Sequence, residues 1–239
     1  MRSLLAGLVV ATALGGAASA ADMPVKARPV PPAQAFNWTG LYIGGSAGYA
    51  WGDVDWVYHD PTGGLVDRPI TNNPASADGG FGGGHFGYQH QFGQWVLGVE
   101  ANFLYSGSSI DGSELCFNQN FTCHVRLNNW WTVGGRLGYA LDRWMIYGTG
   151  GFARGSIRTF ETNNATGAVI FPTSGVHDGW FAGAGIEYAI TNWIILGVEY
   201  THLDFDTKFH PSTSNSEHRN IGAEFDTVRA RLTFRFGAR

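Results

Sequence analysis

The chain has 239 residues, of which 14% are charged and 14% aromatic, and it carries 35 glycines and a net charge of −4. Apolar residues make up 44% of the chain, which excludes a disordered protein, and the glycines follow no period of three, which excludes a collagen-like fibre. The negative net charge leaves no electrostatic footprint for nucleic acid, so no nucleic-acid partner is expected.

The N-terminal residues 1–20 have the pattern of a secretory signal peptide. A positive start at Met1-Arg2 precedes an apolar run from Leu4 to Leu14, and Ala18-Ser19-Ala20 forms an A-x-A cleavage signal. An N-terminal membrane anchor is the alternative, but the apolar run is short for a span. Residues 21–35 are Pro-rich and lack periodicity, which predicts an extended periplasmic linker. The folded domain is expected over residues 36–239.

From Phe36 onward apolar residues recur with a period of two, which indicates β-strands. In the first segment, FNWTGLYIGGSAGYAWG, one face holds Leu41, Ile43, Gly45, Ala47, Tyr49 and Trp51, and the other holds Tyr42, Gly44, Ser46, Gly48 and Ala50. Similar segments follow near residues 80–91, 94–107, 127–140, 143–154, 179–190, 193–203 and 227–236. The faces of segment 143–154 are ambiguous, and we favour Ile146 and Phe152 outward with Tyr147 and Thr149 inward.

The connections between these segments alternate in length. Those at 91–94, 141–143 and 190–192 are short, whereas those at 53–78, 107–123, 155–176 and 204–224 are long and polar. Eight segments of about ten residues can each cross a bilayer as a tilted strand. The pattern predicts an all-β fold, an eight-stranded antiparallel up-and-down transmembrane β-barrel with short periplasmic turns and four long extracellular loops.

The apolar faces end in aromatic residues, as the interfacial girdles of a membrane barrel do. The predicted girdle consists of Trp38, Tyr49, Trp51, Trp95, Tyr105, Trp131, Tyr139, Trp180, Tyr188 and Tyr200. A soluble barrel with an aromatic core is the alternative. Its polar face would then meet water and be rich in Lys, Glu and Asp, whereas the polar face here consists mainly of Gly, Ser, Thr and Asn, which suits a narrow lumen.

Six charged residues fall at mid-strand on the polar face: Glu100, Arg136, Glu187, Glu199, Arg229 and Arg231. In a narrow lumen these charges must pair, because an unpaired buried charge is costly. Side chains can just fill the interior of an eight-stranded barrel. We therefore expect a salt-bridged network that plugs the lumen. A charged, water-filled selectivity path is the alternative.

The two cysteines, Cys116 and Cys123, lie seven residues apart in a polar segment of an exported chain. This context favours a disulfide over a pair of free thiols. A metal site is disfavoured because only His124 lies nearby. No metal and no cofactor are expected.

Three histidine–aspartate combinations occur at the predicted outer rim and are the candidates for catalysis. They are His59-Asp60, His177-Asp178, and His202 with Asp204. No serine lies in a nucleophile motif such as G-x-S-x-G, and Glu100 and Arg136 argue against the apolar lumen that a lipid-modifying site needs. The glycines of GGFGGGHFG open a strand rather than a helix, so they predict no phosphate site. The chain is not expected to be an enzyme.

Several stretches together carry a family resemblance: the signal ending Ala-Ser-Ala-Ala-Asp, the Pro-rich mature start, FNWTGLYIGGSAGYAWG, WTVGGRLGYALDRWMIYGTGGFARG, GWFAGAGIEYAITNWIILGVEY and the terminal VRARLTFRF. The chain resembles the small outer-membrane surface proteins of alphaproteobacteria, a porin family whose barrel is related to the OmpA transmembrane domain. Two features depart from that pattern. Gly237-Ala238-Arg239 follows the terminal aromatic Phe236, and the cysteine pair is not a family requirement.

The resemblance implies location in the cell outer membrane and no catalytic residues. The expected role is structural, supporting envelope integrity and displaying surface loops as a surface antigen. A small-solute porin is one alternative. A surface protein that binds haem, a host molecule or another ligand is a second, because aromatic residues occur in the long loops. Expected partners are outer-membrane lipids, lipopolysaccharide and the outer-membrane assembly machinery, with a homo-oligomer or a host or surface ligand as further alternatives.

Overall fold

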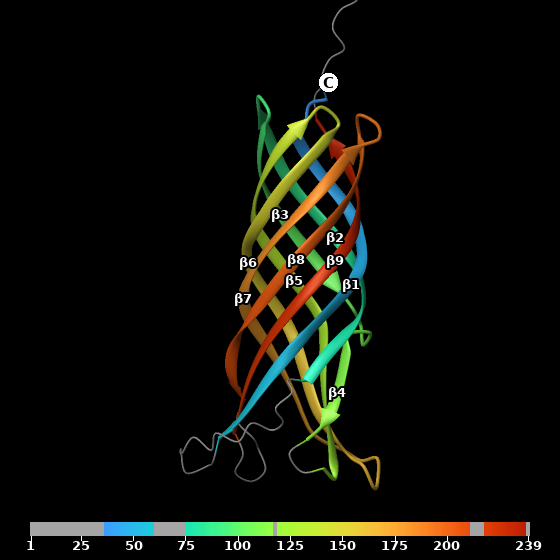
Figure 1. Ribbon diagram of the computed structural model, residues 1–239, viewed down its shortest axis with the longest axis vertical. Coiled ribbons are helices and arrows are strands. Elements are labelled where there is room, and N and C mark those ends of the chain that lie inside the picture. The colour runs from blue at the N-terminus through green and yellow to red at the C-terminus, as the bar shows by residue number, and fades with distance from the viewer. Residues whose placement is uncertain (1–35, 60–74, 117–118, 211–217, 238–239) are drawn as a thin grey trace, which may run out of the picture. The chain divides into compact units, whose positions relative to one another are not determined.

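A computed structural model describes residues 36–59, 75–116, 119–210 and 218–237. The predicted signal peptide and linker, residues 1–35, therefore lie outside the described residues. The described part contains nine strands (Figure 1): β1 Gly40–His59, β2 Ala75–Phe92, β3 Trp95–Tyr105, β4 Asp111–Leu115, β5 Phe121–Leu141, β6 Trp144–Asn163, β7 Val169–Ala189, β8 Ile194–His210 and β9 His218–Phe236. Within it, no helix is long and apolar enough to cross a membrane.

Eight of these strands form a closed antiparallel ring. Each of β1, β2, β3, β5, β6, β7, β8 and β9 pairs with its neighbours, and β1 pairs with both β2 and β9. Following the paired residues once around the ring from Asp53 leads back to β1 at Ile43, ten positions earlier. This stagger tilts the strands and sets a narrow interior. The predicted eight-stranded antiparallel barrel is confirmed.

The ninth strand continues β3 after an interruption. β3 ends at Tyr105, and β4 then occupies the place between β2 and β5, pairing Asp78 with Asp111 on one side and residues 122–126 of β5 on the other. At the interruption, Ser106 N–H donates to Asn128 O over 2.9 Å, beside a register shift between Leu127 and Asn129. The ring thus keeps eight strand positions up to the extracellular rim, and β3 and β4 together fill one of them.

The short turns lie at one end of the barrel, which we call the periplasmic end. Gly93 and Asp142 occupy them with positive φ values of 63° and 55°. At the other, extracellular end the strands run further than the sequence pattern predicted. Most of the expected loop 155–176 is a paired hairpin, because β6 and β7 stay paired up to Thr162 and Val169, across a register shift between Thr159 and Glu161. The ladder continues because both strands keep alternating inward and outward residues.

The polarity of the two faces reverses along each strand, as β9 illustrates. Near the periplasmic end its outward residues are Phe236, Phe234, Leu232, Ala230 and Val228, and its inward residues are Arg235, Thr233, Arg231, Arg229 and Thr227. Closer to the extracellular end, the outward residues are Asp226 and Glu224, while Phe225, Ala223 and Ile221 point inward and are buried. Where the outward residues are apolar, the barrel can contact lipid. Where the outward residues are polar and the inward ones apolar, the barrel is surrounded by water, so the reversal marks the outer membrane surface.

The inward glycines make room for large lumen side chains. A Cβ at Gly48 would lie 2.8 Å from the Cβ of Arg229, and one at Gly44 would lie 2.4 Å from Nε2 of His85. Both approaches are too close for any side chain. The nearest atoms are backbone carbonyl oxygens of β9, Val228 O at 2.2 Å from the added Cβ of Gly48 and Leu232 O at 2.3 Å from that of Gly44. Glycine at these positions is therefore required by the close approach of β9 as well as by the bulk of Arg229 and His85.

Candidate functional site

The six predicted lumen charges converge halfway along the lipid-facing part of the barrel. Glu100 projects from β3, Arg136 from β5, Glu187 from β7, Glu199 from β8, and Arg229 and Arg231 from β9. Their exposed fractions lie between 1% for Glu199 and 6% for Glu100, so water scarcely reaches them. Strand stagger brings together residues that are up to 131 positions apart in sequence.

These residues form one connected set of ion pairs. Arg231 lies at its centre, contacting Glu199, donating from Nη1 to Glu100 Oε1 over 2.9 Å, and approaching Glu187 Oε1 with Nε at 3.6 Å. Arg136 Nη2 lies 2.9 Å from Glu187 Oε2, and its Nη1 lies 3.3 Å from Glu100 Oε2. Arg229 pairs with Glu199 and lies 3.9 Å from Glu100. Three cations thus neutralise three anions.

Neutral polar side chains complete the network, and only their inward orientation could be predicted from the sequence. Tyr42 donates its hydroxyl to Glu100 over 2.9 Å, and Tyr147 donates to Glu199 over 2.6 Å. Asn102 accepts from Arg229 over 2.9 Å. The guanidinium of Arg136 also lies over the Tyr147 ring, 3.9 Å from its centroid. The inward positions of these residues in the period-two pattern were the available signal, but a tyrosine there reads equally well as filler.

Apolar layers close the lumen on both sides of the charges. The extracellular layer contains Phe81, Trp130, Phe181, Phe205 and Phe225 among seventeen buried residues. The periplasmic layer contains Phe36, Trp38, Val96, Met145 and Ile195 among eight. The charged network is therefore enclosed between two apolar layers. These layers lower the local dielectric constant, which strengthens the attraction between the paired charges.

The prediction that Trp38 belongs to the lipid-facing girdle is wrong. Its side chain is 0% exposed, packs edge-on against Phe36 at a ring separation of 4.9 Å, and donates from Nε1 to Asp142 O over 3.0 Å. Gln89 Nε2 donates to Trp38 O over 2.8 Å and fixes the segment across the barrel mouth. Trp38 precedes the first strand, so the alternation that assigns faces within a strand does not extend to it.

The other predicted girdle residues face outward. They are Tyr49, Trp51, Trp95, Tyr105, Trp131, Tyr139, Trp180, Tyr188 and Tyr200, with Trp131 and Tyr139 partly covered by neighbours. At the outer boundary of the lipid-facing band, three of these aromatic residues donate a hydrogen bond to an aspartate on a neighbouring strand, nearer the extracellular end. Tyr200 donates to Asp226 over 2.6 Å, Trp180 Nε1 donates to Asp204 over 3.1 Å, and Tyr49 donates to Asp78. Rings in the apolar band and carboxylates above it suit a membrane–water interface.

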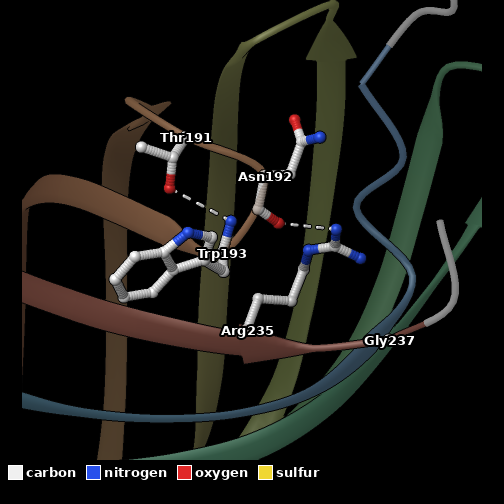
Figure 2. A pocket seen from close by; sticks show the side chains of 5 residues that line it. All are labelled: Thr191, Asn192, Trp193, Arg235 and Gly237. Carbon is white, nitrogen blue, oxygen red and sulfur yellow. Dashed lines mark hydrogen bonds between the residues drawn. The ribbon is translucent and has the colours of Figure 1, made fainter.

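A pocket at the periplasmic mouth is lined by Thr191, Asn192, Trp193, Arg235 and Gly237 (Figure 2). Arg235 donates from Nη2 to Asn192 O over 2.8 Å and from Nη1 to Thr39 O over 2.7 Å. The guanidinium thus joins the β7–β8 turn, the start of the barrel and its last strand. Because both of these guanidinium donors already bind backbone carbonyls, we interpret Arg235 as a structural link between the segments rather than as a ligand-binding group.

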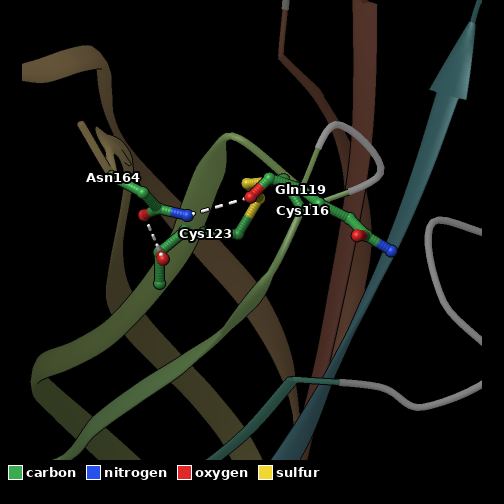
Figure 3. The surroundings of a disulfide bond; sticks show 5 residues. Cys116, Gln119, Cys123 and Asn164 are labelled. Atoms are coloured by element: carbon green, nitrogen blue, oxygen red, sulfur yellow. Dashed lines mark hydrogen bonds between the residues drawn. A yellow bond between two sulfur atoms is a disulfide. The ribbon is translucent and has the colours of Figure 1, made fainter.

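Cys116 and Cys123 form a disulfide at the extracellular rim, joining the end of β4 to β5 (Figure 3). Asn164, in the β6–β7 connection, donates to Gln119 O over 3.0 Å and accepts from Thr122 over 2.7 Å. Glu161 lies close enough to both sulfurs to suggest a metal site. Disulfide sulfurs are not thiolates, however, and thiolates are what bind metal.

Of the three histidine–aspartate combinations at the predicted outer rim, the two that the structure describes are not assembled as pairs. His177 points inward and is 0% exposed, whereas the neighbouring Asp178 points outward. His202 Nδ1 lies 2.9 Å from Asp226, on β9, rather than bonding Asp204. The His59 side chain and Asp60 lie outside the described residues.

A closed ring with an apolar outer band, aromatic ends and a neutralised polar interior defines an integral membrane β-barrel. The chain belongs to the outer membrane protein beta-barrel domain family, whose model matches residues 8–236. It is therefore a protein of the cell outer membrane.

Two curated relatives cover nearly the whole chain. The 31 kDa outer-membrane immunogenic protein of Brucella melitensis is 34% identical over 235 residues, 95% of this chain and 97% of the relative. The 22 kDa outer membrane protein of Rhizobium leguminosarum is 30% identical, covering 99% of this chain and 100% of the relative. Among solved structures, OprG of Pseudomonas aeruginosa is similar at a TM-score of 0.49 and 11% identity, covering 84% of this chain and 99% of that one.

Proposed function

We propose that this protein is a closed, structural outer-membrane barrel that supports envelope integrity and holds its extracellular rim as a surface display. The observation that carries the proposal is the filled lumen. Six charges pair with one another at 6% exposure or less, between two apolar layers. A path for ions or solutes would require these buried pairs to separate, and separating buried ion pairs is strongly unfavourable.

The same architecture supports a non-enzymatic role. The described His–Asp combinations point to different faces or pair with other residues, so they do not form a nucleophile–base arrangement. The proposed partners are the outer-membrane lipids, lipopolysaccharide around the aromatic band, and the outer-membrane assembly machinery that inserts the ring. No partner protein is needed to complete the described lumen network.

Planar-bilayer conductance of the refolded protein tests the closed lumen. We expect no steady single-channel steps for the wild-type protein. The variant Arg231→Ala, which removes the cation at the centre of the network, should conduct more often than the wild type. Regular steps from the unaltered protein would favour the porin alternative and overturn the proposal.

Envelope integrity is tested in cells of the source organism. Deletion should raise sensitivity to detergent and chelator, and re-expression of the wild-type barrel should restore resistance. Re-expression of Leu97→Arg, which places a charge in the apolar band, should restore it less well at equal transcript levels. Unchanged sensitivity after deletion would refute the structural role while leaving the conductance result unaffected.

A further inference from the structure

An acidic face lies just above the lipid-facing band on one side of the barrel. It consists of Asp53 and Asp55 on β1, Glu224 on β9 and Asp204 on β8. Glu224 lies directly opposite Asp53 on one neighbouring strand and Asp204 on the other. Like charges in directly opposed positions destabilise a sheet, and the side chain of Glu224 makes no hydrogen bond or ion pair with the described residues.

A basic face lies on the other side of the barrel. It consists of Arg126 on β5 with Arg154 and Arg158 on β6, all pointing outward. Arg126 and Arg158 are directly opposite each other, again a like-charge pair. Asp111 neutralises Arg126 over 2.9 Å and Asp178 pairs with Arg154, but Arg158 is exposed and has no partner within the described chain.

The two faces lie on opposite sides at a common height. Around the ring, β1 and β6 are separated by three strands in either direction, as are β9 and β5. Asp53 lies two positions beyond the outward Trp51 of β1, and Arg154 lies two positions beyond the outward Phe152 of β6. In a membrane all copies share one orientation, so the acidic face of one copy meets the basic face of the next at the same level.

Beneath both faces the lipid-facing surface carries a patch of small residues set among larger outward ones, such as Leu232 opposite Gly45 on one side and Leu137 opposite Gly148 on the other. Under the acidic face, Gly45 pairs with Gly84 and Ala47 pairs with Gly82 and Ala230. Under the basic face, Gly135 pairs with Gly150, Gly150 with Ala182, and Gly148 with Ala184.

The barrel itself does not require several of these outward glycines. A Cβ added at Gly45 or Gly82 would meet its nearest atom at 3.7 or 3.6 Å, and one added at Gly135 or Gly148 at 3.9 or 3.8 Å. These are ordinary van der Waals distances, unlike those on the lumen face. Glycine inside a strand costs stability, so its presence here fits the close approach of another surface.

We propose that copies of this barrel associate side by side in the membrane, with the acidic face of one copy against the basic face of the next. The contact pairs Glu224 and Asp53 with Arg158 and Arg126 above the membrane, and brings the two small-residue patches together below. Each opposed like-charge pair then gains a counter-charge. Because the two faces differ and lie on opposite sides, the contact is heterologous and propagates as a row rather than closing as a two-fold dimer.

Fluorescence energy transfer between donor- and acceptor-labelled full-length protein, refolded in phosphatidylcholine vesicles without lipopolysaccharide, tests this contact. The wild type should transfer energy above the random-collision level at low salt and less at high salt. Arg158→Glu and Glu224→Arg should each weaken association about tenfold or more, and the double variant should return to within about threefold of wild type, because the charges are then exchanged across the same contact. Gly82→Leu should weaken association with all charges intact.

Ala165→Glu, which adds a negative charge at the exposed β6–β7 connection outside both faces, is the matched control and should associate like the wild type. Retention of the heat-modifiable gel shift shows that each variant is folded. Random-level transfer by the wild type at low salt would overturn the proposal, as would failure of the double variant to recover. Transfer that appears only when lipopolysaccharide is added would overturn it in favour of an anionic glycolipid on the arginines.

Discussion

Arg231 and Glu100 are 131 residues apart in sequence, yet Arg231 Nη1 donates to Glu100 Oε1 over 2.9 Å at the centre of the barrel. The contact joins β9 to β3 across the lumen, not along a sheet. Because Arg231 also contacts Glu187 and Glu199, it connects all three carboxylates. The lumen network is therefore a cross-brace of the ring as well as a plug.

Removing the Arg231 side chain should be strongly destabilising. Arg231→Ala leaves three buried carboxylates short of a cation, which should cost about 3–5 kcal/mol. Glu199→Gln should cost less, because the amide keeps hydrogen bonds with its neighbours. Urea unfolding in lipid vesicles measures both. Arg158→Ala, an exposed and unpaired arginine, is the control and should change stability by no more than about 0.5 kcal/mol.

A double-mutant cycle tests whether the network acts as a unit. Arg231→Met and Glu100→Gln should show a coupling energy of about 0.5–3 kcal/mol, since the two side chains touch and share partners. The same cycle on Arg231 and Asp178, which lie in different parts of the barrel, should be additive. Additivity in the first cycle would contradict a shared network.

Charges placed on the lipid face should be costly only within the apolar band. Leu97 and Val198 are 57% and 52% exposed and face outward between the two aromatic levels. Arg at either position should cost about 2–4 kcal/mol, as expected near the bilayer midplane. Ser174→Arg, outward on β7 above the band, should cost about 0.5 kcal/mol or less. Equal costs at all three positions would refute the placement of the membrane boundary.

The apolar extracellular layer should contribute to stability like the core of a water-soluble protein. Phe225 is 1% exposed, within the cluster that also holds Trp130 and Phe205. Phe225→Ala should cost about 3–5 kcal/mol, because truncation leaves a cavity in a packed layer. Phe92→Ala, at a residue 61% exposed next to a periplasmic turn, is the matched control and should cost much less. A loss below about 1 kcal/mol at Phe225 would mean that the layer is loosely packed.

The rim carboxylate Asp178 should titrate unusually low. Hydrogen bonds from Arg154 and from Lys208, the latter over 3.0 Å, lower its pKa to about 2. In the unfolded chain the pKa of an aspartate is about 3.9. The ionised form thus favours the folded state above about pH 4, and that contribution is lost as the pH falls towards 2.

The carboxyl carbon chemical shift of Asp178, followed against pH in micelles, measures this midpoint. Arg154→Gln should raise the midpoint towards the unfolded value, because it removes the strongest donor to the carboxylate. Since the Asp178 carboxylate is partly exposed to water above the lipid-facing band, the accompanying change in global stability should be small. An identical midpoint in the wild type and the variant would show that Arg154 does not set the pKa.

Much of the fold follows from alternation within single strands. Val228, Leu232 and Phe236 can be assigned to the lipid face, and Arg229 and Arg231 to the lumen face, without any tertiary information. The short turns then give the order of the strands around the ring. The upper halves of the strands were missed for a physical reason. Once the outer surface carries Asp226 and Glu224, a strand core of Ile221, Ala223 and Phe225 looks like a polar loop, although its period is still two.

The members of the lumen network could be predicted, but their pairings could not. Which charges come level depends on the ten-position stagger of the closed ring, a property of all eight strands together. Trp38 was misplaced because it lies outside any alternating segment. Tyr42 and Tyr147 were missed because an inward aromatic says nothing about what its hydroxyl bonds.

The reversal of polarity along each strand also sets how deeply the protein inserts. Sliding the barrel outward would expose leucine and phenylalanine to water, and sliding it inward would drag Asp226, Glu224 and Asp53 into hydrocarbon. Either displacement meets a rising cost on all sides of the ring at once. The alternating sequence therefore fixes the depth at which the barrel sits in the membrane. The extracellular rim should stay at a constant distance from the bilayer surface as the protein diffuses.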